Sequence, residues 1–143
     1  MPNQQIKIRA SKVGVLMTTP NKDEISKGAQ TYMRELWLQN EYNYKPLVTS
    51  KYLEKGIAFE DEAIGLLSDL DDEFYFKNTE RKENDYISGE CDIEADNKIV
   101  DIKNCYTLKT FMDAEITKVY EWQLRAYMEL YDKPKAELVY CIL

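Results

Sequence analysis

Three charged side chains in the second half of the sequence are spaced to meet at one site. Asp96-Asn97 suits a two-residue hairpin turn, because both residue types tolerate the positive φ that such turns need. With this turn, Asp92 lies directly opposite Asp101 on the neighbouring strand. Lys103, two residues after Asp101, projects to the same face of the sheet. The spacing therefore predicts two carboxylates and an ammonium group side by side.

Two carboxylates in these positions repel each other unless a cation lies between them. Directly opposed side chains are about 4.5 to 5.5 Å apart at Cβ, and the repulsion amounts to roughly 3 kcal/mol at an effective dielectric constant near 20. A divalent cation reverses the sign of this energy. In the alternative interpretation, Asp92 and Asp101 are solvated on an open sheet face and Lys103 neutralises them.

Polar residues at three helical positions extend this candidate site. Glu60 occupies a position in a predicted helix, residues 51–70, where the period of the apolar stripe calls for an apolar side chain. Carboxylates are rarely buried unless they are paired or bind a metal, although Glu60 at the edge of the stripe could reach water. Gln123 and Tyr127 are four residues apart and share a face of another helix. They either form an internal hydrogen bond or reach a ligand.

The elements that must position these residues follow from hydrophobic periodicity and turn signals. The N-terminal part predicts a helical lead, with one helix over residues 11–17 capped by Ser11 and a longer one over residues 22–42. Thr49 and Ser50 are candidate caps of the helix at 51–70. Strands are expected at 73–77, 86–95 and 98–105, followed by a short helix at 108–114, a helix at 118–131 that ends at Asp132-Lys133-Pro134, and a final buried strand at 136–143. We therefore expect an α/β protein with a mixed sheet in a single domain, residues 1–143, comprising the lead (1–48) and an αβββαβ core (49–143).

The amino-acid composition limits the kinds of active site and metal site that the chain could form. The chain has 143 residues, a net charge of −7 and no histidine, which excludes Ser-His and Cys-His nucleophiles and zinc sites built on imidazole. A metal would be held by carboxylates, which select hard cations such as Mg²⁺, Mn²⁺ or Ca²⁺. The three cysteines, Cys91, Cys105 and Cys141, are far apart and form no CxxC pair, and the N-terminus has no apolar run. We expect a soluble protein in the cytoplasm.

Four motifs in order resemble the PD-(D/E)xK nucleases, and within them the phage exonuclease branch that contains lambda exonuclease and the YqaJ-type viral recombinases. The motifs are Lys55-Gly56-Ile57-Ala58-Phe59-Glu60, Gly89-Glu90-Cys91-Asp92, Val100-Asp101-Ile102-Lys103 and Gln123-x-x-x-Tyr127. The segment Arg9-Ala10-Ser11-Lys12-Val13-Gly14 is similar to the N-terminal part of that branch. The resemblance implies a restriction-endonuclease-like core, whose element order is the one inferred above.

The resemblance also implies a deoxyribonuclease that depends on Mg²⁺ or Mn²⁺. By similarity, the metal ligands are Asp92, Asp101, the backbone carbonyl of Ile102 and, directly or through water, Glu60. Lys103 orients and helps to deprotonate the attacking water. Gln123 and Tyr127 match an element that positions this lysine and the DNA.

The partner implied by the resemblance is DNA, chiefly double-stranded ends in the cytoplasm of a bacterial host. Ser11 matches a serine that contacts DNA, and Arg9 is a candidate replacement for an arginine whose position is taken by Gln4. The predicted DNA-binding residues are Arg9, Ser11, Lys12, Lys109 and Arg125, which with Arg81, Lys82, Lys103 and Lys118 would form a local basic groove. A trimeric ring and a single-strand annealing recombinase as partner are further implications. No iron–sulfur cluster is expected, and the chain is either a minimal version of its relatives or part of a longer product.

Three other functions remain open from the sequence. The first is a structure-specific endonuclease of the same superfamily. The second is a non-catalytic module that binds DNA or a recombinase, which the acidic charge would favour but the intact Asp92, Asp101 and Lys103 disfavour. The third is an acidic α+β protein with no role in nucleic-acid chemistry.

Overall fold

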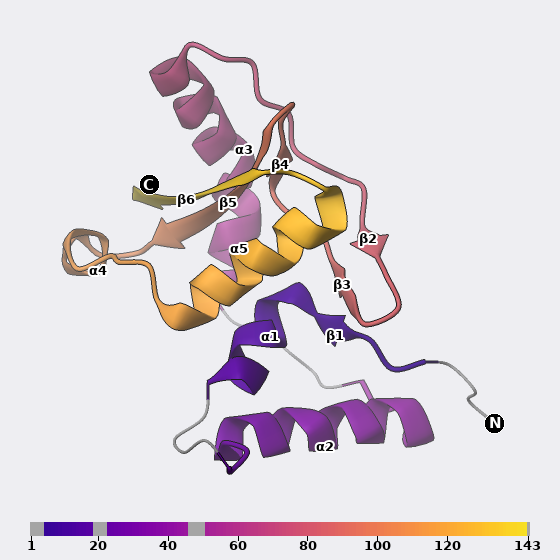
Figure 1. Ribbon diagram of the computed structural model, residues 1–143. Coiled ribbons are helices and arrows are strands. Elements are labelled where there is room, and N and C mark those ends of the chain that lie inside the picture. Colours follow the sequence, from indigo (N-terminus) through magenta and orange to yellow (C-terminus); the bar gives the residue numbers. More distant parts are fainter. Residues whose placement is uncertain (1–4, 19–22, 46–50, 143) are drawn as a thin grey trace.

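The computed structural model describes residues 5–18, 23–45 and 51–142, which form a mixed α/β structure (Figure 1). The N-terminal elements are β1 (Ile8–Arg9), α1 (Ala10–Met17) and α2 (Lys27–Tyr42). The central elements are α3 (Lys51–Asp71), β2 (Lys82–Glu83), β3 (Ile87–Gly89), β4 (Ile93–Glu94) and β5 (Lys98–Cys105). The chain continues with α4 (Leu108–Met112), α5 (Lys118–Tyr131) and β6 (Lys135–Ile142).

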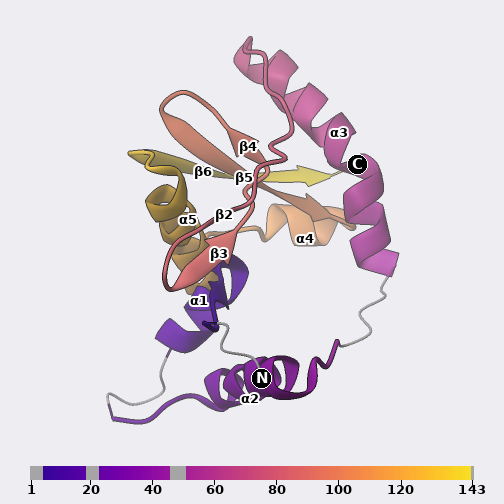
Figure 2. The same cartoon turned by 90° about the vertical axis from the view of Figure 1, so that its right-hand side faces the viewer.

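One sheet lies between two helices. Its strand order is β4-β5-β6, with β4 antiparallel and β6 parallel to the central strand β5. Figure 2 shows α3 on one side of this sheet and α5 on the other. Side chains of β5 alternate between the two faces, as strand geometry requires. Ile99 packs with the cluster built on α5, whereas Val100 packs with Ile64 and Leu67 of α3. By this alternation Asp101 shares the face of Ile99.

A smaller sheet joins the N-terminal part to the rest. Its order is β1-β3-β2, with Ile8 paired to Ile87 in parallel and Lys82 paired to Gly89 in antiparallel orientation. From β1 the chain enters α1, which packs on α5, and α2 lies against α1 at the base of the view in Figure 1. The helical lead is thereby attached directly to the helix that carries Gln123.

Two glycines allow close contacts around α1. A Cβ at Gly14 would lie 2.6 Å from the Cα of Val119, so the backbones of α1 and α5 approach each other more closely than any side chain permits. A Cβ at Gly89 would lie 2.8 Å from the Cβ of Ala10 and 2.9 Å from Cε1 of Tyr127. The absence of a side chain at both glycines therefore allows α1 and α5 to pack closely near the predicted site.

The predicted fold class is confirmed, and several elements match the sequence analysis closely. β5 and α5 have the predicted bounds, and α5 ends at Asp132, which adopts a left-handed conformation. The predicted hairpin register is confirmed, since Glu94 pairs with Ile99 and the amide of Ala95 donates to the carbonyl of Lys98 at 2.9 Å. The expected positive φ in the turn is wrong, because neither Asp96 nor Asn97 has one. The candidate caps Thr49 and Ser50 lie outside the described residues.

Three strand predictions are corrected by the structure. Residues 73–77 form no ladder with the described strands; single hydrogen bonds hold this segment instead, such as the one from the amide of Tyr75 to Oγ of Ser68 at 3.2 Å. The strand expected at 86–95 is two short strands in different sheets, β3 and β4, because the chain crosses from one sheet to the other after Gly89. The last strand is a half-buried edge strand rather than a buried one.

The two N-terminal helices begin at other residues than expected. Arg9 precedes the first turn of α1 as its cap residue, so Ser11 lies within the helix. The helix α2 begins at Lys27, since Oγ of Ser26 accepts a hydrogen bond from the amide of Ala29 at 3.1 Å and so caps the first turn. The short strands β1 and β2 had no signal in the sequence, because two-residue strands lack any periodicity.

Among the described residues, no helix is both long and apolar enough to cross a membrane.

The close contact at Gly14 gives a prediction about stability. We expect Gly14→Ala to lower the free energy of unfolding by about 1 to 3 kcal/mol, because the new methyl group must push the backbone of α5 away. Gly65→Ala is the matched control, since a Cβ there meets nothing within 4 Å and alanine favours a helix by up to about 1 kcal/mol. Urea unfolding followed by circular dichroism measures both, and equal effects of the two substitutions would contradict the packing argument.

Candidate active site

The hairpin of β4 and β5 brings Asp92 and Asp101 together. Ile93 pairs with Val100, which places Asp92 next to Asp101 at the point where β4 begins. The edge of β5 is open from there on, and the carboxylate of Asp92 takes the place of a strand partner: its Oδ2 accepts a hydrogen bond from the amide of Ile102 at 2.6 Å. The sequence therefore positions this carboxylate through the backbone of the strand that carries Asp101.

The two carboxyl groups influence each other strongly. The pKa of Asp92 is raised to about 7, chiefly by burial, then by the charge of Asp101 and to a smaller extent by Glu60, while the hydrogen bond from Ile102 acts in the opposite direction. Oδ2 of Asp101 is buried and accepts no hydrogen bond from the described residues, although it forms an ion pair with Lys103. Such a pair of partly buried, under-neutralised carboxylates suits a divalent cation with oxygen ligands.

Lys103 connects this carboxylate pair to α5. Its Nζ lies 2.9 Å from Oδ2 of Asp101 and donates a hydrogen bond to Oε1 of Gln123 at 3.1 Å. Nε2 of Gln123 in turn donates to the hydroxyl of Tyr127 at 3.1 Å. Burial raises the pKa of Tyr127, followed by the negative charge of Asp101, so Tyr127 is a neutral phenol. The predicted residues of β5 and α5 thus form one continuous polar chain.

Two tyrosine side chains lie beside Lys103. Nζ of Lys103 lies 4.6 Å from the centroid of the Tyr120 ring, within the range of a cation–π interaction. The ring of Tyr120 lies 6.4 Å from that of Tyr140, whose hydroxyl donates to the carbonyl of Glu115 at 2.6 Å. These contacts leave the ammonium group of Lys103 with little freedom to turn away from Asp101.

A pocket of about 350 Å³ opens at this place. Four of the predicted site residues line it, namely Glu60, Asp92, Ile102 and Lys103. Tyr120 and Tyr140 also line it. Ile102 contributes its amide to the positioning of Asp92, and the role of its carbonyl as a ligand stays a prediction. The pocket is large enough for a hydrated cation and part of a nucleotide.

Glu60 lies in the pocket wall but not in contact with the carboxylate pair. Its Oε2 forms an ion pair with Nζ of Lys77 at 3.1 Å. Across residues 5–18, 23–45 and 51–142, no three Cys, Asp or Glu side chains converge closely enough to hold a metal ion. The arrangement is instead a pair of aspartates with a third carboxylate at the pocket wall, which agrees with the one or two protein carboxylates that Mg²⁺ commonly uses.

The predicted DNA-binding residues lie outside the pocket. Arg9 and Ser11 are exposed at the start of α1, and Lys12 stacks over the ring of Tyr32 at 5.9 Å. Lys109 pairs with Asp113 at 2.7 Å. Arg125 pairs with Glu121 at 3.0 Å and stacks over Trp122, on the side of α5 that faces solvent. Arg9, Ser11 and Lys12 lie together at the start of α1, and the contact of all five residues with DNA stays a prediction.

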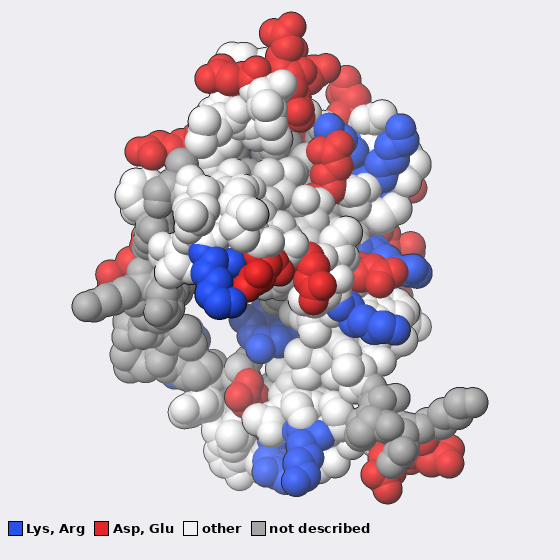
Figure 3. Space-filling view, turned by 90° about the vertical axis from the view of Figure 1, so that its left-hand side faces the viewer, with Lys and Arg blue, Asp and Glu red and all other residues white. Residues whose placement is uncertain are grey.

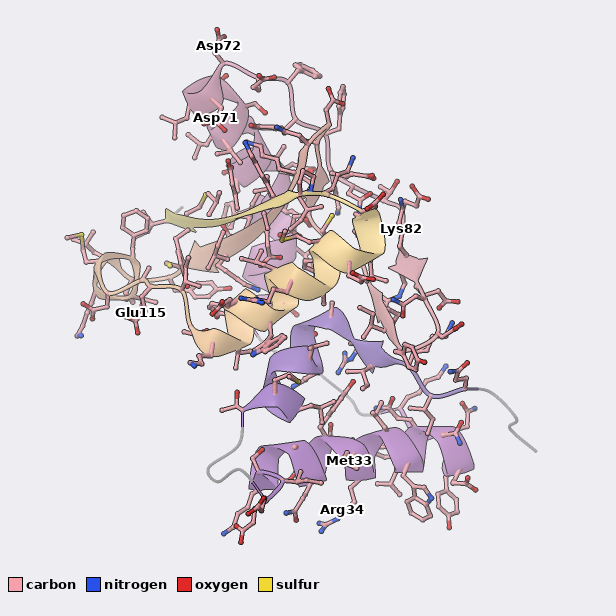
Figure 4. All side chains as sticks on the ribbon, viewed as in Figure 1. Met33, Arg34, Asp71, Asp72, Lys82 and Glu115 are labelled. Atoms are coloured by element: carbon pink, nitrogen blue, oxygen red, sulfur yellow. The ribbon has the colours of Figure 1, made fainter. Side chains whose placement is uncertain are left out.

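Charge is unevenly distributed over the surface. On the face shown in Figure 3, acidic side chains gather at the top, whereas Lys and Arg side chains border a hollow near the middle. Figure 4 places Asp71 and Asp72 at that acidic end, and it shows Glu115 and Lys82 at opposite ends of α5. Lys82 lies 5.0 Å from the centroid of the Tyr131 ring and so belongs to the end of α5 distant from Gln123.

Sequence reasoning missed two residues that shape the site, Lys77 and Tyr120. Tyr120 had a usable signal, because it precedes Gln123 by three residues and therefore shares its helical face. Lys77 had none, since it lies in the segment that was expected to be a strand and its ion pair with Glu60 joins elements distant in the sequence.

Comparison with solved structures identifies the fold. A phage-related exonuclease from Haemophilus somnus 129PT superposes with a TM-score of 0.84 at 25% identity, over 98% of this chain and 70% of that one. An alkaline exonuclease, LHK-Exo from Laribacter hongkongensis, gives a TM-score of 0.80 at 18% identity over 96% of this chain and 70% of that one. The same enzyme in complex with dAMP gives 0.77 at 18% identity over 95% of this chain and 69% of that one. A scan against protein-family models finds no match, and neither does a search of curated proteins. The chain has the fold of phage-type exonucleases.

The raised pKa of Asp92 predicts how stability depends on pH in the absence of divalent cations. The folded protein holds a proton on Asp92 up to about pH 7, whereas the pKa of an aspartate in the unfolded chain is 3.8, so the free energy of unfolding falls as pH rises between these values. Asp92→Asn cannot ionise, and in EDTA we expect it to remove this decline and to be more stable than the parent protein above pH 7.

Urea unfolding in EDTA between pH 4 and 8 tests this expectation. Asp69→Asn, at an exposed position of α3, is the matched control and should keep the pH dependence of the parent protein. If Asp92→Asn and the parent lose the same free energy of unfolding between pH 4 and 8, Asp92 is not the group that causes the pH dependence.

Proposed function

We propose that this chain is a deoxyribonuclease of the PD-(D/E)xK superfamily that hydrolyses phosphodiesters with Mg²⁺ or Mn²⁺. We further propose that it is an exonuclease that degrades double-stranded DNA ends for phage-type homologous recombination. The observation that carries the proposal is the contact of Asp92 and Asp101 beside Lys103, at the wall of a pocket in a phage-exonuclease fold.

Acidic residues in and beside the pocket would hold the cation: Glu60 and Asp92 line it, and Asp101 lies next to Asp92 behind its wall. Asp92 and Asp101 are the principal ligands, with the carbonyl of Ile102 and, directly or through water, Glu60 as further ones. A bound Mg²⁺ ion would lower the pKa of a water molecule and neutralise charge on the phosphoryl oxygens. The hydrogen bond from the amide of Ile102 keeps Asp92 in place, so the carboxylate pair is preorganised before any ligand arrives.

Lys103 is the residue that would act on the reacting groups. Its ammonium group can hold the attacking water in line and stabilise negative charge on the phosphate, because it lies at the pocket wall beside Asp101. Gln123 fixes the ammonium group by accepting its hydrogen bond, and Tyr127 fixes the amide of Gln123. Gln123 and Tyr127 are therefore positioning residues rather than groups that touch the substrate.

The preference for DNA ends rests on the structural neighbours. Both are exonucleases, and one has been solved with dAMP, a deoxynucleotide. Contacts to the duplex through Arg9, Ser11, Lys12, Lys109 and Arg125 belong to this proposal, as do a trimeric ring and a single-strand annealing recombinase as partner. A local basic surface is needed, because the net charge of −7 opposes binding of a polyanion.

Nuclease assays with paired variants test the catalytic assignment. We expect Asp101→Asn and Lys103→Gln each to lower the rate of cleavage of linear duplex DNA in Mg²⁺ by at least about 100-fold, since each removes a group that acts on the reacting atoms. Asp69→Asn and Lys135→Gln make the same charge changes at exposed positions and should keep full activity. Circular dichroism verifies that all four proteins fold.

The substrate form separates the nuclease types. An end-labelled linear duplex should be degraded from its ends, while covalently closed circular DNA should stay intact. Comparison of 5′-phosphate with 5′-hydroxyl ends gives the polarity and tests whether Arg9 replaces the arginine absent at Gln4. Cleavage of the circle would favour an endonuclease, and intact linear and circular DNA across Mg²⁺ and Mn²⁺ would overturn the proposed function.

A further inference from the structure

A lysine outside the recognised motifs lies at the edge of the pocket. Nζ of Lys77 is 3.1 Å from Oε2 of Glu60, with the lysine side chain 47% exposed and the glutamate 20% exposed. We propose that Lys77 is an exchangeable counter-ion, which neutralises Glu60 in the metal-free protein and binds a phosphate of the DNA backbone once a divalent cation engages Glu60. This inference rests on the proposed function and adds a residue to its substrate-binding machinery.

The backbone beside Lys77 is fixed to the site. The amide of Asn78 donates to the carbonyl of Asp92 at 2.8 Å, and Nδ2 of Asn78 donates to the carbonyl of Cys91 at 2.9 Å. The residue next to Lys77 is therefore bonded directly to one of the two aspartates of the carboxylate pair. Because the anchor lies in the backbone, the long and half-exposed side chain of Lys77 can change partners without moving the chain.

Three carboxylates of the described residues act on Lys77. Glu60 is the strongest influence and raises the pKa of Lys77, with weaker contributions from Asp61 and Glu90, so Lys77 is an ammonium ion at any neutral pH. Glu60 also adds to the repulsion on Asp92 across the same pocket. Two lysines thus neutralise two of the three predicted carboxylate ligands, Lys77 at Glu60 and Lys103 at Asp101.

A divalent cation in the pocket would compete with Lys77 for Glu60. When Glu60 turns to a cation in the pocket, directly or through water, it loses its interaction with Lys77, and the cation repels the ammonium group. The displaced ammonium group is then an unpaired positive charge at the pocket edge. The ligand chemistry that suits it is a phosphate of the substrate, which an ammonium group binds as a compact point charge.

The other candidate cations are less suited to this task. Lys109 and Arg125 pair with Asp113 and Glu121, whose partnership metal binding in the pocket would not break. Lys103 stays beside Asp101 and Gln123. Lys77 and Lys103 both pair with predicted metal ligands, but Lys103 also donates a hydrogen bond to Gln123. Among these four cations, Lys77 is therefore the one that a metal bound to Glu60 would release toward a phosphate.

Metal binding without DNA tests the first half of the proposal. An exposed ion pair competes only weakly with a metal for Glu60, so we expect Lys77→Gln to bind Mg²⁺ about two- to fivefold more tightly in calorimetric titration. Lys77→Arg keeps the charge and should bind as the parent does. Equal or weaker Mg²⁺ binding by Lys77→Gln overturns the proposal.

The salt dependence of DNA binding tests the second half. In a Lys103→Gln background, expected to bind DNA without cutting it, anisotropy of a labelled duplex gives the slope of log affinity against log salt concentration. In Mg²⁺, Lys77→Gln should reduce the magnitude of this slope by about 1, which is the loss of one phosphate contact, whereas in EDTA it should leave the slope unchanged. Lys135→Gln, at an exposed position, is the matched control and should change neither slope. An unchanged slope in Mg²⁺ overturns the proposal.

The two levels of proposal fail differently. A parent protein that neither binds Mg²⁺ nor cleaves DNA overturns the proposed function and this inference together. A parent protein that does both, with Lys77→Gln unchanged in Mg²⁺ affinity and salt slope, overturns only the role of Lys77.

Discussion

Two carboxyl groups, those of Asp92 and Asp101, are held in contact in a partly buried position where their charges repel. Backbone interactions hold them there. A tight turn sets the hairpin register, and the amide of Ile102 donates a hydrogen bond to Asp92. The raised pKa of Asp92 reflects its burial first and the charge of Asp101 second. Neighbouring groups then respond to it, as Lys103 pairs with Asp101 and Gln123 orients Lys103. Such a pair of repelling carboxylates suits the cation site that we propose.

The part of the site that lies on one hairpin was predictable from the sequence. Asp96-Asn97 determines the register, and the two-residue period of a strand then places Asp92, Asp101 and Lys103 on one face. The pairing of Gln123 with Tyr127 followed from helical spacing in the same way. Local geometry was sufficient in both cases, because each relationship spans a single turn or helix.

Relationships between distant elements were not predictable. The ion pair of Glu60 with Lys77 joins α3 to a segment that alternates like a strand, with Phe74 and Phe76 exposed, but is held by isolated hydrogen bonds. The break of the expected strand after Gly89 depends on how closely Ala10 and Tyr127 approach from two helices. Periodicity carries no information on such contacts, since they depend on tertiary packing rather than on neighbours in the sequence.

The contact at Gly14 has a mechanical consequence. The backbones of α1 and α5 are in contact there, and Val119 lies only four residues before Gln123. The two helices therefore have less freedom to shift relative to each other than helices whose contact is made by side chains. The exposed start of α1, with Arg9 and Ser11, is thereby held at a constant distance from α5 and from the residues that α5 carries. Gly14 thus fixes how far this exposed segment lies from Gln123 and Lys103.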